Sequence, residues 1–266
     1  MSTRRAILLL SAALAVSFST GARTIRAADA GKIERREITS GGKRRTYYLY
    51  VPPDVTKDAT VPLVLTLHGS GMDGRGLVVE WKKLASKEHF IVAGPDSRDS
   101  AGWSVPVDGP EFLRDLVEEL KKTAPIDPRR VYLFGWSAGA NFGLQMSLYE
   151  SEYFAAASIF AGALLPVRYP MLEQAARKIP ISLTVGTSDP FYSLRDVRAT
   201  RDVLKAHGFT VQLKELLGQD HNYYDTADQI NRDSWAFLSQ YRLEDEPHFR
   251  DSPAKISTGS TPEGKR

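Results

Sequence analysis

The fold of this chain is decided by the stretch Val131-Tyr132-Leu133-Phe134-Gly135-Trp136-Ser137-Ala138-Gly139. Its first four residues are apolar and predict a buried strand. The Gly-x-Ser-x-Gly pattern that follows predicts a sharp turn into a helix, with the Ser137 hydroxyl lifted clear of the sheet. A serine hydroxyl is a poor nucleophile at neutral pH unless a base takes its proton. The chain must therefore also supply a base, an acid that orients it, and donors for an oxyanion.

Apolar runs that predict strands alternate with helical periodicity on both sides of this turn. Residues 61–67 are continuously apolar, as is typical of a strand buried on both faces. Residues 33–50 instead alternate around Ser40-Gly41-Gly42-Lys43, which predicts an antiparallel hairpin. Further strands are expected over 90–95, 155–160, 181–185 and 211–217, and helices over 77–88, 111–123, 141–149, 171–177, 196–207 and 226–242. The sequence predicts an α/β fold, a mostly parallel central sheet with helices on both faces and an antiparallel N-terminal edge hairpin.

The two ends of the chain differ in composition from its middle. Arg4 and Arg5 precede an apolar segment over 6–18 and small residues follow, the pattern of a signal peptide. The paired arginines also resemble a twin-arginine export signal, so that both export routes stay open. Residues 244–266 are polar and aperiodic and predict a disordered tail. We therefore expect a signal peptide over 1–30, a catalytic domain over 31–243, and an exported product that is periplasmic or secreted.

Composition excludes several classes of site. The 266 residues contain no cysteine, which rules out disulfides, thiolate metal sites and a cysteine nucleophile. The net charge is +3, and residues 1–30 carry four arginines against one aspartate, so that the remainder is close to neutral. Nucleic-acid binding is therefore not expected. The apolar segment 6–18 is too short for a stable membrane anchor. No cluster of His, Asp and Glu has ligand spacing, and no metal or cofactor is expected.

His221 is the predicted base. It follows the strand expected over 211–217, at the strand end where parallel sheets carry functional loops, and it comes after the serine in the order Ser…Asp/Glu…His. His89 precedes the serine, His207 lies at the end of a predicted helix, and His248 lies in the tail. The alternative for His221 is an ordinary surface-loop histidine.

Asp189 is the preferred orienting acid, because it follows an apolar strand and a Gly-Thr turn. Such a carboxylate holds the imidazole tautomer and stabilises the imidazolium. A simple turn-forming role before Pro190 is the alternative. Asp220 and Asp225 are rivals, although Asp220 is adjacent to the base and neighbouring side chains usually point apart.

The oxyanion is expected to meet two backbone amides. One belongs to Ala138, directly after the nucleophile. The other is assigned to Ser70, in the glycine-rich turn over 67–74. His68 in the same turn precedes the serine, and we expect it to hydrogen-bond the loop rather than act as a base.

The chain carries the glycine-rich turn, Ser137, Asp189 and His221 in this order, and with them it resembles an α/β-hydrolase. More narrowly, it resembles the exported esterases that include polyhydroxybutyrate-depolymerase-like proteins and feruloyl or acetylxylan esterases. The resemblance spans residues 63 to 241 and implies Ser137 as nucleophile, Asp189 as acid, His221 as base, and the Ser70 and Ala138 amides as oxyanion donors. The chain departs from the depolymerase-like pattern around these residues. That pattern often has a cysteine at Ser70, Gly-Gly where this chain has Gly139-Ala140-Asn141, glycine at Asp220 and tryptophan at Asn222. The matching stretches are Leu67-His68-Gly69, residues 126–132, Gly135-Trp136-Ser137-Ala138-Gly139, residues 154–157, Gly186-Thr187-Ser188-Asp189 and Asp220-His221.

Aromatic residues on the predicted functional loops are candidates for substrate contact, with loop packing as the alternative: Trp103, Phe191, Tyr192, Tyr223 and Tyr224. The span 162–180 is too short for a large apolar cap, which weighs against a lipase. The leading hypothesis is a serine carboxylic-ester hydrolase acting on a short-chain, hydroxyalkanoate or plant-polysaccharide-linked ester. The alternatives are a serine peptidase of the same fold and a non-catalytic binding protein on a hydrolase scaffold.

Overall fold

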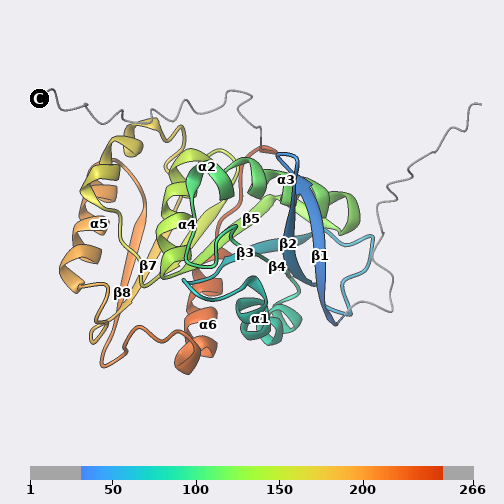
Figure 1. The fold of residues 1–266 in the computed structure, drawn as a ribbon, viewed down its shortest axis with the longest axis horizontal. Coiled ribbons are helices and arrows are strands. Elements are labelled where there is room, and N and C mark those ends of the chain that lie inside the picture. Colours follow the sequence, from blue (N-terminus) through green and yellow to red (C-terminus); the bar gives the residue numbers. More distant parts are fainter. Residues whose placement is uncertain (1–30, 248–266) are drawn as a thin grey trace, which may run out of the picture.

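An eight-stranded sheet forms the centre of the computed structural model, which describes residues 31–247 (Figure 1). The strand order is β1-β2-β4-β3-β5-β6-β7-β8. The strands from β3 to β8 pair in parallel, and β2 pairs antiparallel with both β1 and β4. The predicted fold class is therefore confirmed. The strands are β1 Ile33–Ser40, β2 Lys43–Tyr50, β3 Val61–Leu67, β4 Ile91–Pro95, β5 Ile126–Trp136, β6 Ala156–Phe160, β7 Ile181–Gly186 and β8 Val211–Leu216.

The edge hairpin forms as predicted, because two glycines supply the turn. Gly41 and Gly42 have φ of 54° and 72°, and Ser40 pairs directly with Lys43. A two-residue turn with positive φ at both positions matches the twist of the strands it joins. The hairpin is fixed to the parallel sheet through the pairing of β2 with β4.

The parallel strands direct their carboxyl ends to one edge. All seven residues of β3 are buried, as the apolar run predicts. β4 pairs with one edge of β3, and the next strand, β5, pairs with its other edge. Such a reversal of strand order opens a crevice at the carboxyl end of the strands, where α/β proteins bind their ligands.

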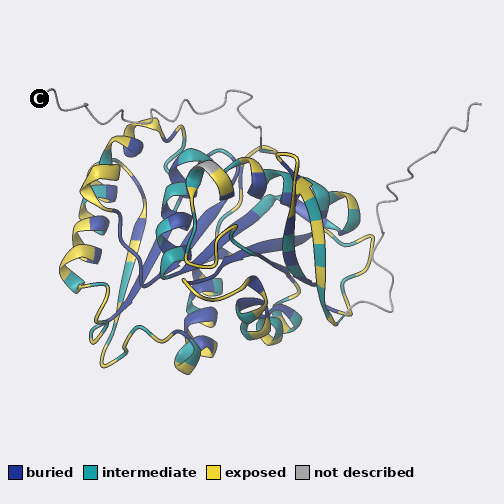
Figure 2. Ribbon diagram, in the orientation of Figure 1, coloured by how far each residue is buried: buried dark blue, intermediate teal, exposed yellow. Residues whose placement is uncertain are grey.

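Helices cover both faces, as Figures 1 and 2 show: α1 and α6 pack on one face with one buried cluster, and α3, α4 and α5 pack on the other. The helices are α1 Gly74–Glu88, α2 Val105–Asp108, α3 Glu111–Thr123, α4 Ala138–Tyr149, α5 Leu194–Ala206 and α6 Ala227–Leu238, with 3₁₀ helices over Pro166–Gln174 and Tyr224–Thr226. The helix expected over 171–177 is corrected to the 3₁₀ helix Pro166–Gln174. Pro170 inside it has no N–H to donate to a regular α-helix.

The predicted signal peptide over 1–30 lies outside the described residues, as does the predicted tail from residue 248 onward. Leu243 is 2% exposed, and its N–H donates to the Arg129 carbonyl at 2.9 Å, so that the end of the predicted domain is attached to β5. The domain boundaries themselves remain predictions. Between residues 31 and 247 the chain forms no helix of the length and apolarity that a membrane span requires.

Candidate active site

Ser137 lies at a strained turn between β5 and α4. Its backbone has φ 57° and ψ −118°, a conformation that non-glycine residues rarely adopt. The turn is possible because a glycine stands two residues on. A Cβ built on Gly139 would lie 2.0 Å from the Leu67 carbonyl oxygen, so that only glycine lets α4 pack this closely on the end of β3. The predicted strand-turn-helix geometry is thus realised at Ser137.

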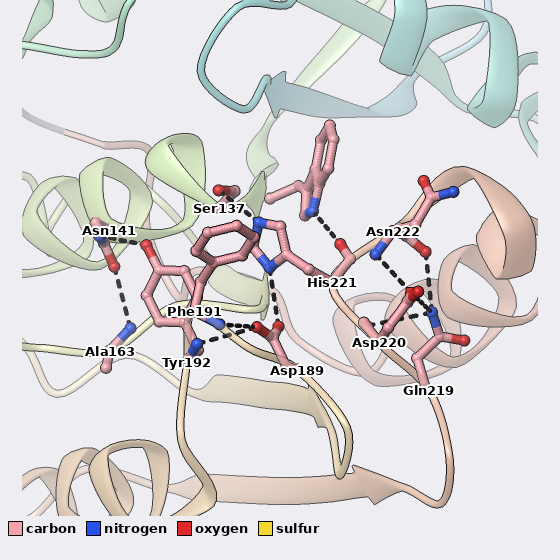
Figure 3. Close-up of polar contacts among 11 residues, drawn as sticks. Ser137, Asn141, Ala163, Asp189, Phe191, Tyr192, Gln219, Asp220, His221 and Asn222 are labelled. Atoms are coloured by element: carbon pink, nitrogen blue, oxygen red, sulfur yellow. Dashed lines mark hydrogen bonds and ion pairs between the residues drawn. The ribbon is translucent and has the colours of Figure 1, made fainter.

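A chain of hydrogen bonds connects Ser137, His221 and Asp189, which come from three separate loops (Figure 3). The Ser137 Oγ lies 2.9 Å from His221 Nε2, and His221 Nδ1 lies 2.9 Å from Asp189 Oδ2. A carboxylate only accepts, so Nδ1 carries the proton and Nε2 is free to accept the serine hydroxyl. This is the arrangement in which an imidazole can take a proton from the serine.

Further hydrogen bonds fix the positions of the Asp189 carboxylate and of the His221 backbone. The Asp189 side chain has no exposed surface, and its Oδ1 accepts the N–H groups of Phe191 at 2.8 Å and Tyr192 at 3.0 Å. The Trp136 indole N–H donates to the His221 carbonyl at 3.1 Å. Side chains fixed in this way lose little freedom when a substrate binds, which favours a preorganised site.

The rival carboxylates are not brought to the imidazole. Asp220 accepts the N–H of Asn222 at 2.8 Å, and Asp225 is exposed in the 3₁₀ helix Tyr224–Thr226. His89 and His207 lie at the C-terminal ends of α1 and α5. Across residues 31–247 no three His, Asp or Glu side chains gather in an arrangement that could hold a metal ion.

The turn after β3 and the start of α4 converge beside Ser137. A Cβ built on Gly69 would lie 3.3 Å from Ser137 Cβ, and one built on Gly102 would lie 3.9 Å from both Ala138 Cβ and Ser70 Oγ. Among the described residues, neither the Ser70 N–H nor the Ala138 N–H donates a hydrogen bond. Two unused amides next to a nucleophile are what a developing oxyanion requires.

His68 is buried and forms hydrogen bonds that stabilise the turn after β3. Its Nδ1 donates to the Gly69 carbonyl at 2.8 Å and its Nε2 accepts the Ser97 N–H at 3.1 Å, while the Trp103 indole N–H donates to the His68 carbonyl at 2.8 Å. Burial lowers the pKa of the imidazole, which keeps it neutral. The structure thus gives His68 the loop-bonding contacts expected of it.

The aromatic residues expected to contact substrate divide into two groups. Phe191 is 75% exposed with its ring edge on His221, and Tyr192 stacks on the same imidazole with ring centroids 5.7 Å apart. Trp103 lines a pocket next to Ala138. The expectation for Tyr223 is wrong: its side chain has no exposed surface and its hydroxyl donates to Asn231 in the core. Tyr224 is half-buried, and burial raises its pKa to about 12.

The pocket beside Ala138 also contains polar residues that the sequence interpretation missed. It has a volume of about 260 Å³, and Asn141 and Gln145 of α4 and Arg168 contribute to its lining. A signal was available, since Asn141 and Gln145 are polar residues spaced i, i+4 on a helix that is otherwise mostly buried.

Comparison with known proteins agrees with this geometry. The profile of the dienelactone hydrolase family matches residues 104–242, more than half of the chain. The chain belongs to the dienelactone hydrolase family. The α/β-hydrolase resemblance inferred from the sequence is therefore confirmed.

Individual relatives of this family member match over part of their length. A bifunctional acetylxylan esterase/xylanase, XynS20E, from Neocallimastix patriciarum is 29% identical over 59% of this chain and 23% of its own. Poly(3-hydroxyalkanoate) depolymerase C from Paucimonas lemoignei is 31% identical over 39% of this chain and 28% of its own. The chain thus spans about a quarter of the length of these two relatives. A thermostable esterase of known structure aligns with a TM-score of 0.64 over 79% of this chain and 63% of its own at 23% identity, a likeness of fold alone.

Proposed function

We propose that this protein is a serine carboxylic-ester hydrolase that works through an acyl-enzyme. Ser137 is the nucleophile, His221 the general base and then the general acid, and Asp189 the carboxylate that orients the imidazole. The amides of Ser70 and Ala138 form the oxyanion hole. The observation that carries the proposal is the unbroken hydrogen-bond chain from Ser137 Oγ to Asp189 Oδ2, next to two amides without acceptors among the described residues.

Acylation begins when Ser137 Oγ attacks the ester carbonyl carbon and its proton passes to His221 Nε2. The carbonyl oxygen becomes an oxyanion and receives the two amide N–H groups. Each such donor typically contributes about 2.7–4 kcal/mol to transition-state stabilisation. The bond to the leaving oxygen then breaks, the imidazolium gives that oxygen the proton, and the alcohol departs. Asp189 stabilises the imidazolium throughout.

Deacylation repeats these steps with water in place of the serine. His221 Nε2 takes a proton from water, the resulting hydroxide attacks the acyl carbon, and the same amides hold the second oxyanion. The bond to Ser137 Oγ breaks, the serine recovers its proton from the imidazolium, and the carboxylic acid leaves. Atoms and charges balance without any metal or cofactor.

The class of bond follows from the relatives. One relative is named as an acetylxylan esterase/xylanase and another as a poly(3-hydroxyalkanoate) depolymerase, and they align with 59% and 39% of this chain. This favours a carboxylic ester over a peptide bond. We further propose that residues 1–30 export the protein, so that its substrates are short-chain, hydroxyalkanoate or polysaccharide-linked esters met outside the cytoplasm.

The test is hydrolysis of p-nitrophenyl acetate and butyrate by the wild-type protein, by Ser137→Ala and by Ser239→Ala. Ser239 is exposed at the end of α6 and serves as the matched serine control. The proposal expects turnover by the wild type and Ser239→Ala, and none above background by Ser137→Ala. Turnover that survives in Ser137→Ala contradicts it, and cleavage of peptide p-nitroanilides in preference to esters would support the peptidase alternative.

A further inference from the structure

The pocket of about 260 Å³ lies on one side of Ser137 and the imidazole on the other. The pocket is lined by ten residues, among them Ala138, Asn141 and Ala163, and none of the ten is His221, Asp189, Phe191 or Tyr192. In Figure 3, Asn141 and Ala163 lie to one side of Ser137 and the paired Asp189 and His221 to the other. Tyr192 lies between the two groups, and its hydroxyl accepts a hydrogen bond from Asn141 Nδ2 at 2.7 Å. The pocket and the imidazole thus border the nucleophile from two directions, with the Tyr192 side chain as the wall between them.

The chemistry assigns one half of an ester to each side. In the tetrahedral intermediate the leaving oxygen must face His221, because the imidazolium protonates it. The oxyanion faces the Ser70 and Ala138 amides. The acyl chain takes the remaining direction, away from the imidazole and into the pocket beside Ala138 and Asn141.

We infer that this pocket is the acyl subsite and that Gln145 makes it select acyl groups carrying a hydroxyl, while the alcohol side is permissive. The inference rests on the proposed function. The alcohol side is bordered by Phe191, whose ring is 75% exposed, so that a leaving alcohol of any size can extend into solvent. Selectivity is therefore expected on the side of the pocket.

The pocket wall suits a flat or extended chain. Trp103 and Phe142 stack with ring centroids 4.9 Å apart and planes at 14°. The Trp103 indole is fixed by its hydrogen bond to the His68 carbonyl. A fixed pair of rings gives a rigid apolar surface against which an acyl chain packs without ordering the wall first.

Some polar groups of the pocket lining have no hydrogen-bond or ion-pair partner among the described residues. Gln145 Nε2 donates to the Asn141 carbonyl at 3.2 Å, which fixes the orientation of the amide. Gln145 Oε1 is then buried and has no partner among the described residues. Arg168 is exposed at the same pocket, and no ion pair joins it to a carboxylate within residues 31–247. A hydroxyl both donates and accepts, so it can satisfy Gln145 Oε1 and take a bond from Arg168, whereas a hydrocarbon chain can do neither.

The first experiment tests the side assignment. Leu165 lines the pocket and is 62% exposed, and Val167 is 78% exposed on the following 3₁₀ helix without lining it. Leu165→Trp is expected to lower kcat/KM for p-nitrophenyl octanoate relative to the acetate, by about tenfold or more. It should not change the ranking of methyl, butyl and benzyl acetates. Val167→Trp, the matched control, should change neither series, and an effect of Leu165→Trp on the alcohol series alone would overturn the assignment.

The second experiment tests the hydroxyl preference. Methyl 3-hydroxybutyrate is compared with methyl butyrate, and methyl p-coumarate with methyl cinnamate, so that aliphatic and aromatic sources are distinguished. One hydrogen bond predicts that the wild type prefers the hydroxylated member of at least one pair by about threefold to tenfold in kcat/KM. Gln145→Leu is expected to bring that ratio close to one.

Two outcomes would overturn the hydroxyl preference: a wild type that favours neither hydroxylated ester, or a ratio that persists in a folded Gln145→Leu variant. Should that variant fail to fold, the wild-type ratios alone decide. Ser137-dependent turnover of p-nitrophenyl acetate separates the two proposals. If it is present and the pairs show no preference, the subsite inference fails and the proposed function stands; if it is absent, the proposed function fails.

Discussion

Gly139→Ala tests the close packing that holds Ser137 in place. An added Cβ would lie 2.0 Å from the Leu67 carbonyl oxygen and 2.6 Å from the His68 carbonyl oxygen, whereas ordinary contact begins at 3.4 Å. Both neighbours are backbone, so α4 must move away from β3 by more than 1 Å to relieve the overlap. A misplacement of about 1 Å at a catalytic centre costs on the order of 100-fold in rate. We therefore expect kcat/KM for p-nitrophenyl butyrate to fall about 100-fold, with a lower melting temperature.

Gly143→Ala on the same helix is the matched control. Its Cβ would meet the Ile159 and Leu67 side-chain methyl groups at 3.2 and 3.4 Å, contacts that flexible side chains can relieve. Alanine also has the higher helix propensity, by about 1 kcal/mol. This variant should keep kcat/KM within about threefold of the wild type. If Gly139→Ala is as active as Gly143→Ala, the packing argument for the turn is refuted.

Three further changes probe the groups around the site. Asp189→Asn should lower kcat for p-nitrophenyl butyrate by about 10³–10⁴-fold, because an amide favours the wrong imidazole tautomer; a loss below about tenfold in a folded variant would argue against its role. Burial lowers the pKa of His68 below its usual 6.5, so that as pH falls below 6.5 only the unfolded chain takes up this proton. In urea unfolding, this one proton should lower the free energy of unfolding by up to about 1.4 kcal/mol for each pH unit below 6.5, and the slope should be smaller by that amount in His68→Gln. Asp108→Asn removes the negative charge that lies 2.6 Å from the buried guanidinium of Arg45, whose other acceptors are the uncharged Asp96 and Val107 carbonyls. It should lower the free energy of unfolding by about 3–5 kcal/mol, whereas the exposed Asp228→Asn should change it by less than about 1 kcal/mol.

Much of the fold and the core of the site could be predicted because local chemistry determined them. The two glycines at 41–42 specify the hairpin turn, and the apolar run 61–67 specifies a strand buried on both faces. The order of Ser137, Asp189 and His221 specifies which strand ends must meet, since parallel strands bring their carboxyl ends to one edge. These features depend on a few consecutive residues and survive any reasonable packing.

Other features depend on contacts that the sequence does not encode locally. Tyr223 and Tyr224 are neighbours on one loop, yet Tyr223 is fully buried in the core and Tyr224 is only half-buried. The buried pair of Arg45 and Asp108 joins segments 63 positions apart, and it anchors the loop that carries Trp103. Such long-range pairings depend on the tertiary arrangement, and no sequence pattern within either segment predicts them.

The central claim, that Ser137 forms a covalent acyl-enzyme, is tested most directly by mass spectrometry of the protein after treatment with an alkyl fluorophosphonate. Attack by the serine Oγ on phosphorus expels fluoride and leaves a stable adduct that mimics the acyl-enzyme. We predict one adduct per chain, carried by the peptide that contains Ser137, and none in Ser137→Ala or in His221→Ala. Ester hydrolysis by a protein that is unlabelled at Ser137, or labelled at another residue with loss of activity, would contradict the mechanism.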